Sequence, residues 1–417
     1  MGIGCQTWDD SGMKTIGLVS LAEIEDASRR LEGIAVRTPL DRSRSLSQDA
    51  SGPVFIKCEN LQRTGSFKIR GGYNRLSRLP ESAKEKGVVA ASAGNHAQGV
   101  ALAANLLGIR STVYMPENAS IPKIEATKRY GAEVILTGDQ LADSIAVALE
   151  ASERDGTEFI SPFDHAAIIA GQGTIGLEIL ESLDDIGTVV VPIGGGGLIS
   201  GVAAAIKSVR PAVRMVGVQA AGAASIPRCL ELGRVVPAEH VSTIADGIAV
   251  KSPSELTLEH IKTYVDSVVT VGDDALARAV VFAAERMKLV LEPSGAAGVA
   301  ALLQDEHTMT PPVVVLLSGG NIDPLLLLRI IRFGMSSEGR YFAFNTRISD
   351  RPGALHRLVG LIAHSGANVV GVQHHREGFG VHLEEVEVAL QIETKGRPHI
   401  NELMATLAAE GYVVERL

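Results

Sequence analysis

One lysine of this 417-residue sequence, Lys68, stands in surroundings that suit chemistry better than solvation. It follows a Gly65-Ser66 turn and lies between Phe67 and Ile69. An amine that is partly desolvated by apolar neighbours has a pKa below its usual value of about 10.4, and its neutral form is a nucleophile. Such an amine can form a Schiff base with an aldehyde. A solvated lysine at the start of a helix is the alternative that this segment alone leaves open.

Four consecutive glycines suit a phosphate group. Gly194, Gly195, Gly196 and Gly197 follow the apolar segment 188–193 and lead into an expected helix. Their backbone amides are free of side chains, and the helix N-terminus adds about half a positive charge. A plain tight turn is the alternative. A dinucleotide loop fits less well because no obvious acidic residue follows about 20 positions later, and the lack of a Lys-Ser/Thr pair excludes a P-loop.

Two polar segments also come directly after expected strands. They read Ser92-Ala93-Gly94-Asn95-His96 and Ser318-Gly319-Gly320-Asn321. Amides of the first segment could hold a carboxylate, and Asn95 could bond a ring hydroxyl. Helix capping is the alternative for Asn95 and Ser318. Together with the lysine and the glycines, these segments offer a partner for each polar group of pyridoxal phosphate.

The segments between these motifs predict a layered α/β fold. Strands are expected at 54–57, 88–91, 112–115, 134–137, 189–193, 216–219 and 313–317. Helices are expected at 97–107, 141–154, 199–209 and 275–287. Such alternation predicts parallel sheets covered by helices on both faces, with ligands beyond the carboxyl ends of the strands.

After residue 338 the expected order changes to βαββαβ, a ferredoxin-like unit. Its strands are expected at 341–347, 368–374, 384–393 and 412–415, and its helices at 354–364 and 399–409. We therefore predict an N-terminal extension over 1–19, a catalytic region over 20–335 and a separate domain over 338–417. A smaller subdomain, about 57–160, is inserted in the catalytic region.

Composition excludes several classes of partner. The net charge of −9, without a basic stripe, argues against nucleic acid, and no apolar run is long enough to span a membrane. Three widely spaced cysteines fit neither a disulfide framework nor a zinc site, which favours a reducing cytoplasm. Apolar residues make up 46% and aromatic residues 4%, as expected for cores of aliphatic side chains in buried parallel sheets.

Taken in their order along the chain, the four motifs resemble the cofactor motifs of the tryptophan-synthase-β-like (fold type II) pyridoxal-phosphate enzymes. In detail they resemble those of threonine dehydratases, also called threonine ammonia-lyases, and the resemblance covers residues 20–333. The C-terminal unit is similar to an ACT domain, a small-ligand regulatory module. The segments that carry this second resemblance are Asp350-Arg351-Pro352-Gly353 and Gly366-Ala367-Asn368.

The resemblance implies a role for each matching residue. Lys68 would bind the cofactor as a Schiff base and move the substrate α-proton, while Phe67 would pack on the cofactor. Asn95 would bond the 3′-oxygen, and Ser318 would face the pyridine nitrogen. Because a neutral hydroxyl makes the ring a weaker electron sink, loss of a β-hydroxyl is favoured over transamination. The phosphate would be bound by the amides of Gly194, Gly195, Gly196, Gly197 and Leu198, and the substrate carboxylate by Ser92, Ala93, Gly94, Asn95 and His96.

The implied reaction converts L-threonine to 2-oxobutanoate and ammonia, and L-serine to pyruvate, in isoleucine biosynthesis or threonine catabolism. Alternatives of the same fold are serine or aspartate racemase and 3-hydroxyaspartate dehydratase. Serine racemases carry a second serine as base where Ala93 stands, so racemisation is disfavoured. They also bind a divalent metal through carboxylates, which segment 220–225 lacks, so no metal site is expected. A non-enzyme alternative is an amino-acid sensor with a vestigial catalytic region, against which Lys68 and Asn95 argue.

For the C-terminal unit the resemblance implies pairing between subunits and a branched-chain amino-acid effector, isoleucine or valine. The expected contacts are Pro352, Gly353, Ala354, Leu355 and Asn368, since amides at a helix start suit a carboxylate. A homodimer or homotetramer is expected, and a domain kept only for oligomerisation is the alternative. The pair His374-His375 does not predict a metal site, because adjacent strand residues point to opposite faces.

Overall fold

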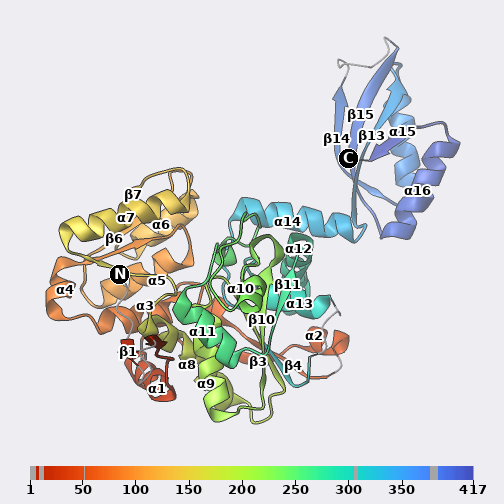
Figure 1. Cartoon of the computed structure of the whole chain (residues 1–417). Helices are drawn as coiled ribbons and strands as arrows, with labels where there is room; N and C mark the ends of the chain where they lie inside the picture. The colour runs from red at the N-terminus through yellow and green to blue at the C-terminus, as the bar shows by residue number, and fades with distance from the viewer. Residues whose placement is uncertain (1–5, 9–13, 51, 305–308, 376–383, 417) are drawn as a thin grey trace. The chain divides into compact units, whose positions relative to one another are not determined.

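The computed structural model describes residues 6–8, 14–50, 52–304, 309–375 and 384–416 (Figure 1). The chain divides into two compact units, Met1–Asp323 and Pro324–Leu417. The first unit contains two mainly parallel sheets, and the second contains one antiparallel sheet. The predicted α/β architecture with a C-terminal βαββαβ unit is therefore confirmed.

The larger sheet of the first unit has six strands in the order β11-β10-β9-β12-β4-β3. All neighbours run parallel except the edge strand β3, which pairs antiparallel with β4. All five residues of β9 are buried and three of them are valines, as expected for a parallel strand that is covered on both faces. The bounds are β3 Leu40–Arg42, β4 Val54–Lys57, β9 Thr188–Pro192, β10 Arg214–Ala220, β11 Ser267–Val271 and β12 Val313–Leu316.

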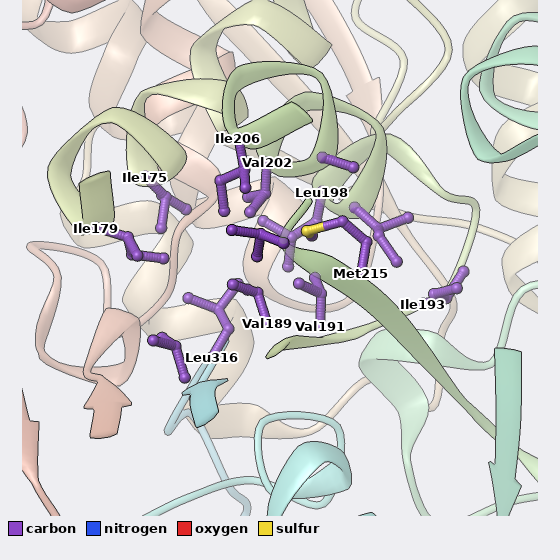
Figure 2. Close-up of a cluster of buried hydrophobic side chains, with 14 of the residues drawn as sticks. Ile175, Ile179, Val189, Val191, Ile193, Leu198, Val202, Ile206, Met215 and Leu316 are labelled. Atoms are coloured by element: carbon purple, nitrogen blue, oxygen red, sulfur yellow. The ribbon is translucent and has the colours of Figure 1, made fainter. Parts of the chain in front are cut away.

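One core layer lies between this sheet and the helices α8 (Ala166–Ser182) and α9 (Gly197–Val209). Figure 2 shows aliphatic side chains of the two helices meeting those of β9 and β10. Ile175 and Ile206 come from the helices, and Val189 and Met215 come from the strands; all four are buried. This layer holds the carboxyl end of β9, and with it the glycine run that follows, in a defined position.

The smaller sheet has four parallel strands in the order β7-β6-β5-β8. Helices cover both faces: α3 and α5 pack on one side of β5, and α7 packs on the other. The strands are β5 Val88–Ala91, β6 Ser111–Met115, β7 Glu133–Leu136 and β8 Glu158–Phe159. The helices are α3 Lys68–Ser77, α4 Glu81–Lys86, α5 Asn95–Leu106, α6 Ile121–Arg129 and α7 Leu141–Asp155.

The remaining elements of the first unit connect these layers. A capping box of Ser20 and Glu23 opens α1. The helices are α1 Leu21–Arg30, α2 Arg44–Asp49, α10 Ile226–Leu232, α11 Glu255–Tyr264, α12 Asp273–Phe282 and α13 Ala297–Leu303. Short 3-10 segments span Glu59–Leu61, Ala221–Ala223 and Asp246–Ile248, and a π-helical turn spans Ala283–Met287. Within the segment expected to be an extension, β1 (Gln6–Trp8) pairs antiparallel with β2 (Lys14–Ile16).

The second unit has the strand order β14-β15-β13-β16, with antiparallel neighbours. Alternate residues of β13 and β15, among them Phe344 and Leu390, are buried against α15 and α16. Helix α14 (Pro324–Ser337) contacts β13, so this unit begins at Pro324, earlier than the expected start at residue 338. The other elements are β13 Tyr341–Ser349, α15 Ala354–His364, β14 Asn368–His375, β15 Glu385–Glu393, α16 Arg397–Ala409 and β16 Val414–Arg416.

Candidate active site

Lys68 is the first residue of α3, directly after a turn that pairs with the loop following β12. The amide of Phe67 donates to the Ser318 carbonyl at 3.3 Å, and the amide of Gly320 donates to the Gly65 carbonyl at 2.9 Å. Nζ of Lys68 donates to the Pro162 carbonyl at 3.0 Å. Backbone pairing therefore joins two of the four sequence motifs, although they lie about 250 residues apart.

The electrostatics around Lys68 shift its amine toward the neutral form. Burial lowers the pKa of Lys68 to about 8, although the carboxylate of Glu292 opposes this shift. Burial, and then the charge of Lys68, lower the pKa of His96 to about 3. The imidazole is thus neutral near pH 7, and its Nε2 lies 2.8 Å from the Ile160 carbonyl, to which it donates. His96 is therefore a buried structural donor rather than a cation beside the lysine.

Helix α5 approaches the lysine closely because Gly99 has no side chain. A Cβ at Gly99 would lie 2.9 Å from Cβ of Lys68, closer than side chains tolerate. This contact positions the first turn of α5 beside the first turn of α3. The segment Ser92-Ala93-Gly94-Asn95-His96 leads into that turn, so the structure brings it to the lysine.

The glycine run forms the turn between β9 and α9. Gly196 adopts φ +95°, which favours glycine, and is the N-cap of the helix. A Cβ at Gly195 would overlap the Phe163 ring, and one at Gly197 would lie 2.8 Å from Cβ of Phe163. Since Pro162 accepts the hydrogen bond from Lys68, the segment 162–163 connects the lysine to this turn.

Two runs of backbone amides at these helix starts have no partner within the described part of the chain. One run comprises Gly194, Gly195, Gly196, Gly197 and Leu198, and all but the first are buried. The other comprises Ala93, Asn95 and His96, while the Gly94 amide donates to Oγ of Ser92 at 3.1 Å. The first amides of a helix have no partner within the helix, so each run can bind an acceptor with several oxygens. In the glycine run most of these amides are also buried, which makes such an acceptor more strongly required there.

Asn95 lies in a hydrogen-bonded chain that joins three of the motifs. Nδ2 of Asn321 donates to the Thr64 carbonyl at 2.7 Å and to Oδ1 of Asn95 at 2.8 Å. Nδ2 of Asn95 donates to Oε1 of Glu292 at 2.6 Å. Glu292 is 3% exposed, and its amide donates to the Gly319 carbonyl at 3.2 Å.

Sequence reasoning missed Glu292 and Phe163. The signal for Glu292 was its isolation, because it is the single charged residue in the apolar run 289–301. A carboxylate in such a run is buried only where it has partners. Phe163 had no comparable signal, since its contact with the glycine run depends on tertiary packing.

Three hydroxyl groups near the loop after β12 are incompletely paired. Oγ of Ser318 has only the Ser294 carbonyl, at 3.5 Å, and Ser318 is 4% exposed. The buried Oγ atoms of Ser66 and Ser294 have no partner within the described residues. Buried hydroxyls without partners indicate a missing polar group. Together with the two amide runs and the amine, they fit pyridoxal phosphate, which carries a phosphate, an aldehyde, a ring oxygen and a ring nitrogen.

The structure does not gather the expected effector contacts within one chain. Pro352, Gly353, Ala354 and Leu355 form the turn into α15, with Gly353 as N-cap at φ +88°. This turn follows Ser349, which pairs with Glu385 at one end of β15. Asn368 pairs with Glu393 at the other end of the same strand. The register therefore places Asn368 about 25 Å from the turn.

The described residues contain no group of three or more His, Cys, Asp or Glu side chains that could hold a metal ion. No helix among them is long and apolar enough to cross a membrane. The segment 220–225, where no metal site was expected, continues from β10 into a 3-10 turn. The two cysteines in the described part of the chain, Cys58 and Cys229, are buried and free.

Comparison with known proteins gives a consistent result. Residues 31–319 match the family described as pyridoxal-phosphate dependent enzyme. The chain is 46% identical to an L-threonine ammonia-lyase of Thermotoga maritima over 95% of its own length and 99% of that protein. It also resembles the structure of a processed threonine deaminase of Solanum lycopersicum, with a TM-score of 0.72, 37% identity, and coverage of 75% and 87% of the two chains. Maize serine racemase gives the same TM-score, 0.72, at 35% identity, and coverage of 78% and 100%.

Proposed function

The chain belongs to the pyridoxal-phosphate dependent enzyme family, and from this premise we propose that it is a threonine ammonia-lyase. It converts L-threonine to 2-oxobutanoate and ammonia by elimination of water, and L-serine to pyruvate. The observation that carries this assignment is the 46% identity to an L-threonine ammonia-lyase over nearly the whole of both chains.

The residues of the site would hold the cofactor as follows. The amides of Gly194, Gly195, Gly196, Gly197 and Leu198 would bind the phosphate. Lys68 would hold the aldehyde carbon through Nζ, and Phe67 would pack on the ring. Asn95 would donate to the ring oxygen, and Ser318 would face the ring nitrogen. When bound, pyridoxal phosphate supplies the electron sink that makes the substrate α-proton acidic.

The chain itself supplies binding and proton transfer. The free amides of Ala93, Asn95 and His96 bind the substrate carboxylate at the positive end of α5. Lys68, whose lowered pKa makes the neutral amine available near pH 8, takes the α-proton. Burial lowers the pKa of His96 to about 3, so its imidazole is too weak a base to compete for that proton. The β-hydroxyl then leaves as water with a proton that balances the one taken up by Lys68. The resulting enamine tautomerises to a 2-imino acid, which one water hydrolyses to the 2-oxoacid and ammonia.

The maize structure makes serine racemase the alternative to weigh. Racemisation needs a base on the face opposite Lys68, and Ala93 has no group that can accept a proton. A coupled assay of 2-oxoacid release from L-threonine, L-serine and 3-hydroxyaspartate, run beside an assay of D-serine formation, tests both. We expect release of 2-oxobutanoate from threonine at the highest kcat/KM and no D-serine. Racemisation faster than elimination would reverse the assignment.

A second measurement tests the alternative that the protein is a sensor with a vestigial catalytic region. Purified enzyme supplied with pyridoxal phosphate is expected to be yellow, because the cofactor joined to Lys68 absorbs visible light. A colourless protein that binds amino acids would support the sensor instead.

We propose further that the second unit binds a branched-chain amino acid, isoleucine or valine. The turn into α15 borders a cavity of about 570 Å³. Arg347 and Arg357 line it and suit a carboxylate, and Leu361 suits an aliphatic side chain. Asn368 lies at the other end of the sheet, so it contributes to this site only from a second copy of the chain. That geometry, with the exposed edge strand β14, supports a homodimer or homotetramer.

Titration of threonine turnover with isoleucine and valine tests the effector. Inhibition by isoleucine would place the enzyme in isoleucine biosynthesis, whereas indifference to both amino acids in turnover and in calorimetry would contradict the regulatory proposal. The buried free cysteines Cys58 and Cys229 support a reducing compartment, and we propose the cytoplasm.

A further inference from the structure

We propose that Glu292 is a positioning residue of the active site, which holds the Asn95 carboxamide so that its second Nδ2–H is directed at the ring oxygen of the cofactor. This inference rests on the proposed role of Asn95. It adds a residue to which the sequence motifs gave no part.

The polarity of the hydrogen-bonded chain can be worked out from one end. The Thr64 carbonyl can only accept, so Asn321 must present its Nδ2 to it. The same Nδ2 lies 2.8 Å from Asn95, which must therefore present Oδ1 to Asn321. Nδ2 of Asn95 is then left facing Glu292, which accepts at 2.6 Å. The carboxamide is held at both ends, and one N–H remains for the cofactor.

The surrounding backbone leaves space for this one carboxylate. A Cβ at Gly319 would overlap Oε1 of Glu292, and a Cβ at Gly247 would lie 3.6 Å from it. Gly319 follows β12, and Gly247 belongs to the 3-10 turn Asp246–Ile248. Gly319, which has no side chain, thus makes room for a carboxylate that is 3% exposed. A buried charge at this level of exposure requires a specific partner, and Asn95 is that partner.

The charges facing the carboxylate come from three elements. Burial, and then Asp246, raise the pKa of Glu292 to about 7, while Lys123 and Lys68 oppose the rise. Lys123 in α6 forms an ion pair with Asp246. The negative charge of Glu292 in turn raises the pKa of Lys68 against the effect of burial. Neutralising Glu292 should therefore lower the pKa of Lys68 further. The pKa of Lys68 thus reports whether a negative charge is present at Glu292.

The test uses the holoenzyme variants Glu292→Gln, Glu292→Ala, Asn95→Ala and the double variant Glu292→Ala/Asn95→Ala. Glu292→Gln keeps an acceptor oxygen at the same place and is the matched control for the loss of the anchor. We expect Glu292→Ala to shift the visible absorption band of the cofactor and to lower kcat by about 10- to 100-fold, with KM changed by less than about threefold. Glu292→Gln should keep kcat within about fivefold of wild type.

The double-mutant cycle separates positioning from simple destabilisation. If Glu292 acts through Asn95, the double variant loses no more than about twofold beyond Asn95→Ala alone. A second readout uses the apoprotein: in Glu292→Gln the pH midpoint for capture of added pyridoxal phosphate should move below that of wild type.

The outcomes distinguish this inference from the proposal on which it rests. An unchanged spectrum and turnover in Asn95→Ala would remove the role of Asn95 and this inference with it. An impaired Asn95→Ala beside an unchanged Glu292→Ala would remove the inference alone. Losses that multiply in the double variant, or a Glu292→Gln as impaired as Glu292→Ala, would also overturn it.

Discussion

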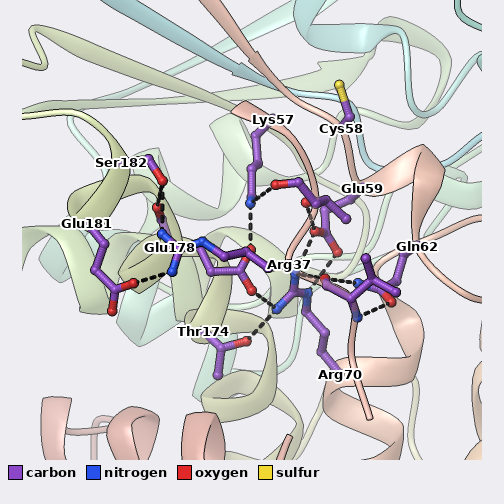
Figure 3. A network of polar contacts seen from close by, with 12 residues as sticks. Arg37, Lys57, Cys58, Glu59, Gln62, Arg70, Thr174, Glu178, Glu181 and Ser182 are labelled. Atoms are coloured by element: carbon purple, nitrogen blue, oxygen red, sulfur yellow. Dashed lines mark hydrogen bonds and ion pairs between the residues drawn. The ribbon is translucent and has the colours of Figure 1, made fainter. Parts of the chain in front are cut away.

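Two polar regions flank helix α3, and they differ in how completely their polar groups are hydrogen-bonded within the protein. On one side, Arg70 forms a buried network of ion pairs with Glu59 and Glu178, which Lys57 joins (Figure 3). On the other side lies Lys68, in the region whose motifs contain amides and hydroxyls without partners in the described part of the chain. The first region is complete in the protein alone, and the second leaves polar groups for the proposed ligand.

The network is fully satisfied. All five guanidinium N–H groups of Arg70 have acceptors: Nε has one, and Nη1 and Nη2 have two each. The two carboxylates balance the two cations. Burial alone would lower the pKa of Arg70, but Glu59 and Glu178 together raise it above its ordinary value. Such a network holds the position and rotation of α3, and therefore the position of Lys68 two residues earlier. Polar groups that are fully hydrogen-bonded within the protein fix the scaffold, and polar groups without partners mark the proposed binding site.

The largest expected effect is the loss of activity when Lys68 is replaced. Lys68→Ala should lower threonine turnover by about 10³-fold or more, since both cofactor attachment and proton transfer use this amine. The free energy of unfolding should change by about 1 kcal/mol or less, because the half-buried side chain makes one hydrogen bond, to the Pro162 carbonyl. Turnover assays and urea unfolding measure the two quantities. Turnover within tenfold of wild type would contradict the role of Lys68.

The matching change on the structural side is Arg70→Met. It leaves Glu59 buried without its cation, so the free energy of unfolding should fall by about 3–5 kcal/mol. Arg37→Met is the control, because its ion pair with Glu181 is more than half exposed and should contribute about 1 kcal/mol or less. Equal losses in the two variants, measured by urea unfolding, would show that the buried network does not anchor α3.

Gly195→Ala tests the free amides. The new Cβ overlaps the Phe163 ring, so the turn must shift, at about 1–3 kcal/mol. We expect the affinity for pyridoxal phosphate to fall by at least about tenfold, as measured by spectroscopic titration. Gly272→Ala is the matched control, since its Cβ meets nothing within 4 Å and its φ is −80°. Unchanged cofactor affinity in Gly195→Ala would move the phosphate away from this turn.

The two regions should also respond to different pH ranges. Burial would raise the pKa of Glu59, but Arg70 lowers it below its ordinary value, so the stability contributed by Glu59 is present above that value and is lost as the pH falls. The pKa of Lys68 is lowered to about 8, so cofactor capture by the apoprotein should rise up to that pH and level off above it. Stopped-flow capture rates that are flat between pH 6 and about 9 would contradict the lysine assignment.

The smallest expected effect comes from Ser318→Asp. A carboxylate beside the ring nitrogen would favour protonation of that nitrogen. We therefore expect elimination to slow by about tenfold, which is more than the expected loss of cofactor affinity. Steady-state kinetics and cofactor titration measure the two. Elimination as fast as in wild type would show that the neutral hydroxyl does not matter.

The sequence predicted the elements better than the contacts between them. Strands β4 and β5 have the expected bounds, because their β-branched and alanine runs stand between clear turn signals. The short edge strands β3 and β8 were missed, since two or three residues show no periodicity. The glycine motif could be recognised because its backbone geometry requires glycine, whereas the lysine and asparagine motifs could be recognised by their places after a Gly-Ser turn and an expected strand. Glu292 and the Arg70 network could not, because their partners lie far away in the sequence and meet only after folding.

One measurement tests the central claim most directly: borohydride reduction of the holoenzyme followed by peptide mapping by mass spectrometry. Reduction makes the bond between cofactor and amine permanent, so the modified lysine is identified whatever the activity of the sample. The completed site described above predicts a single pyridoxyl group, on Lys68. A group on another lysine, or none in a protein that releases 2-oxobutanoate from threonine, would contradict it.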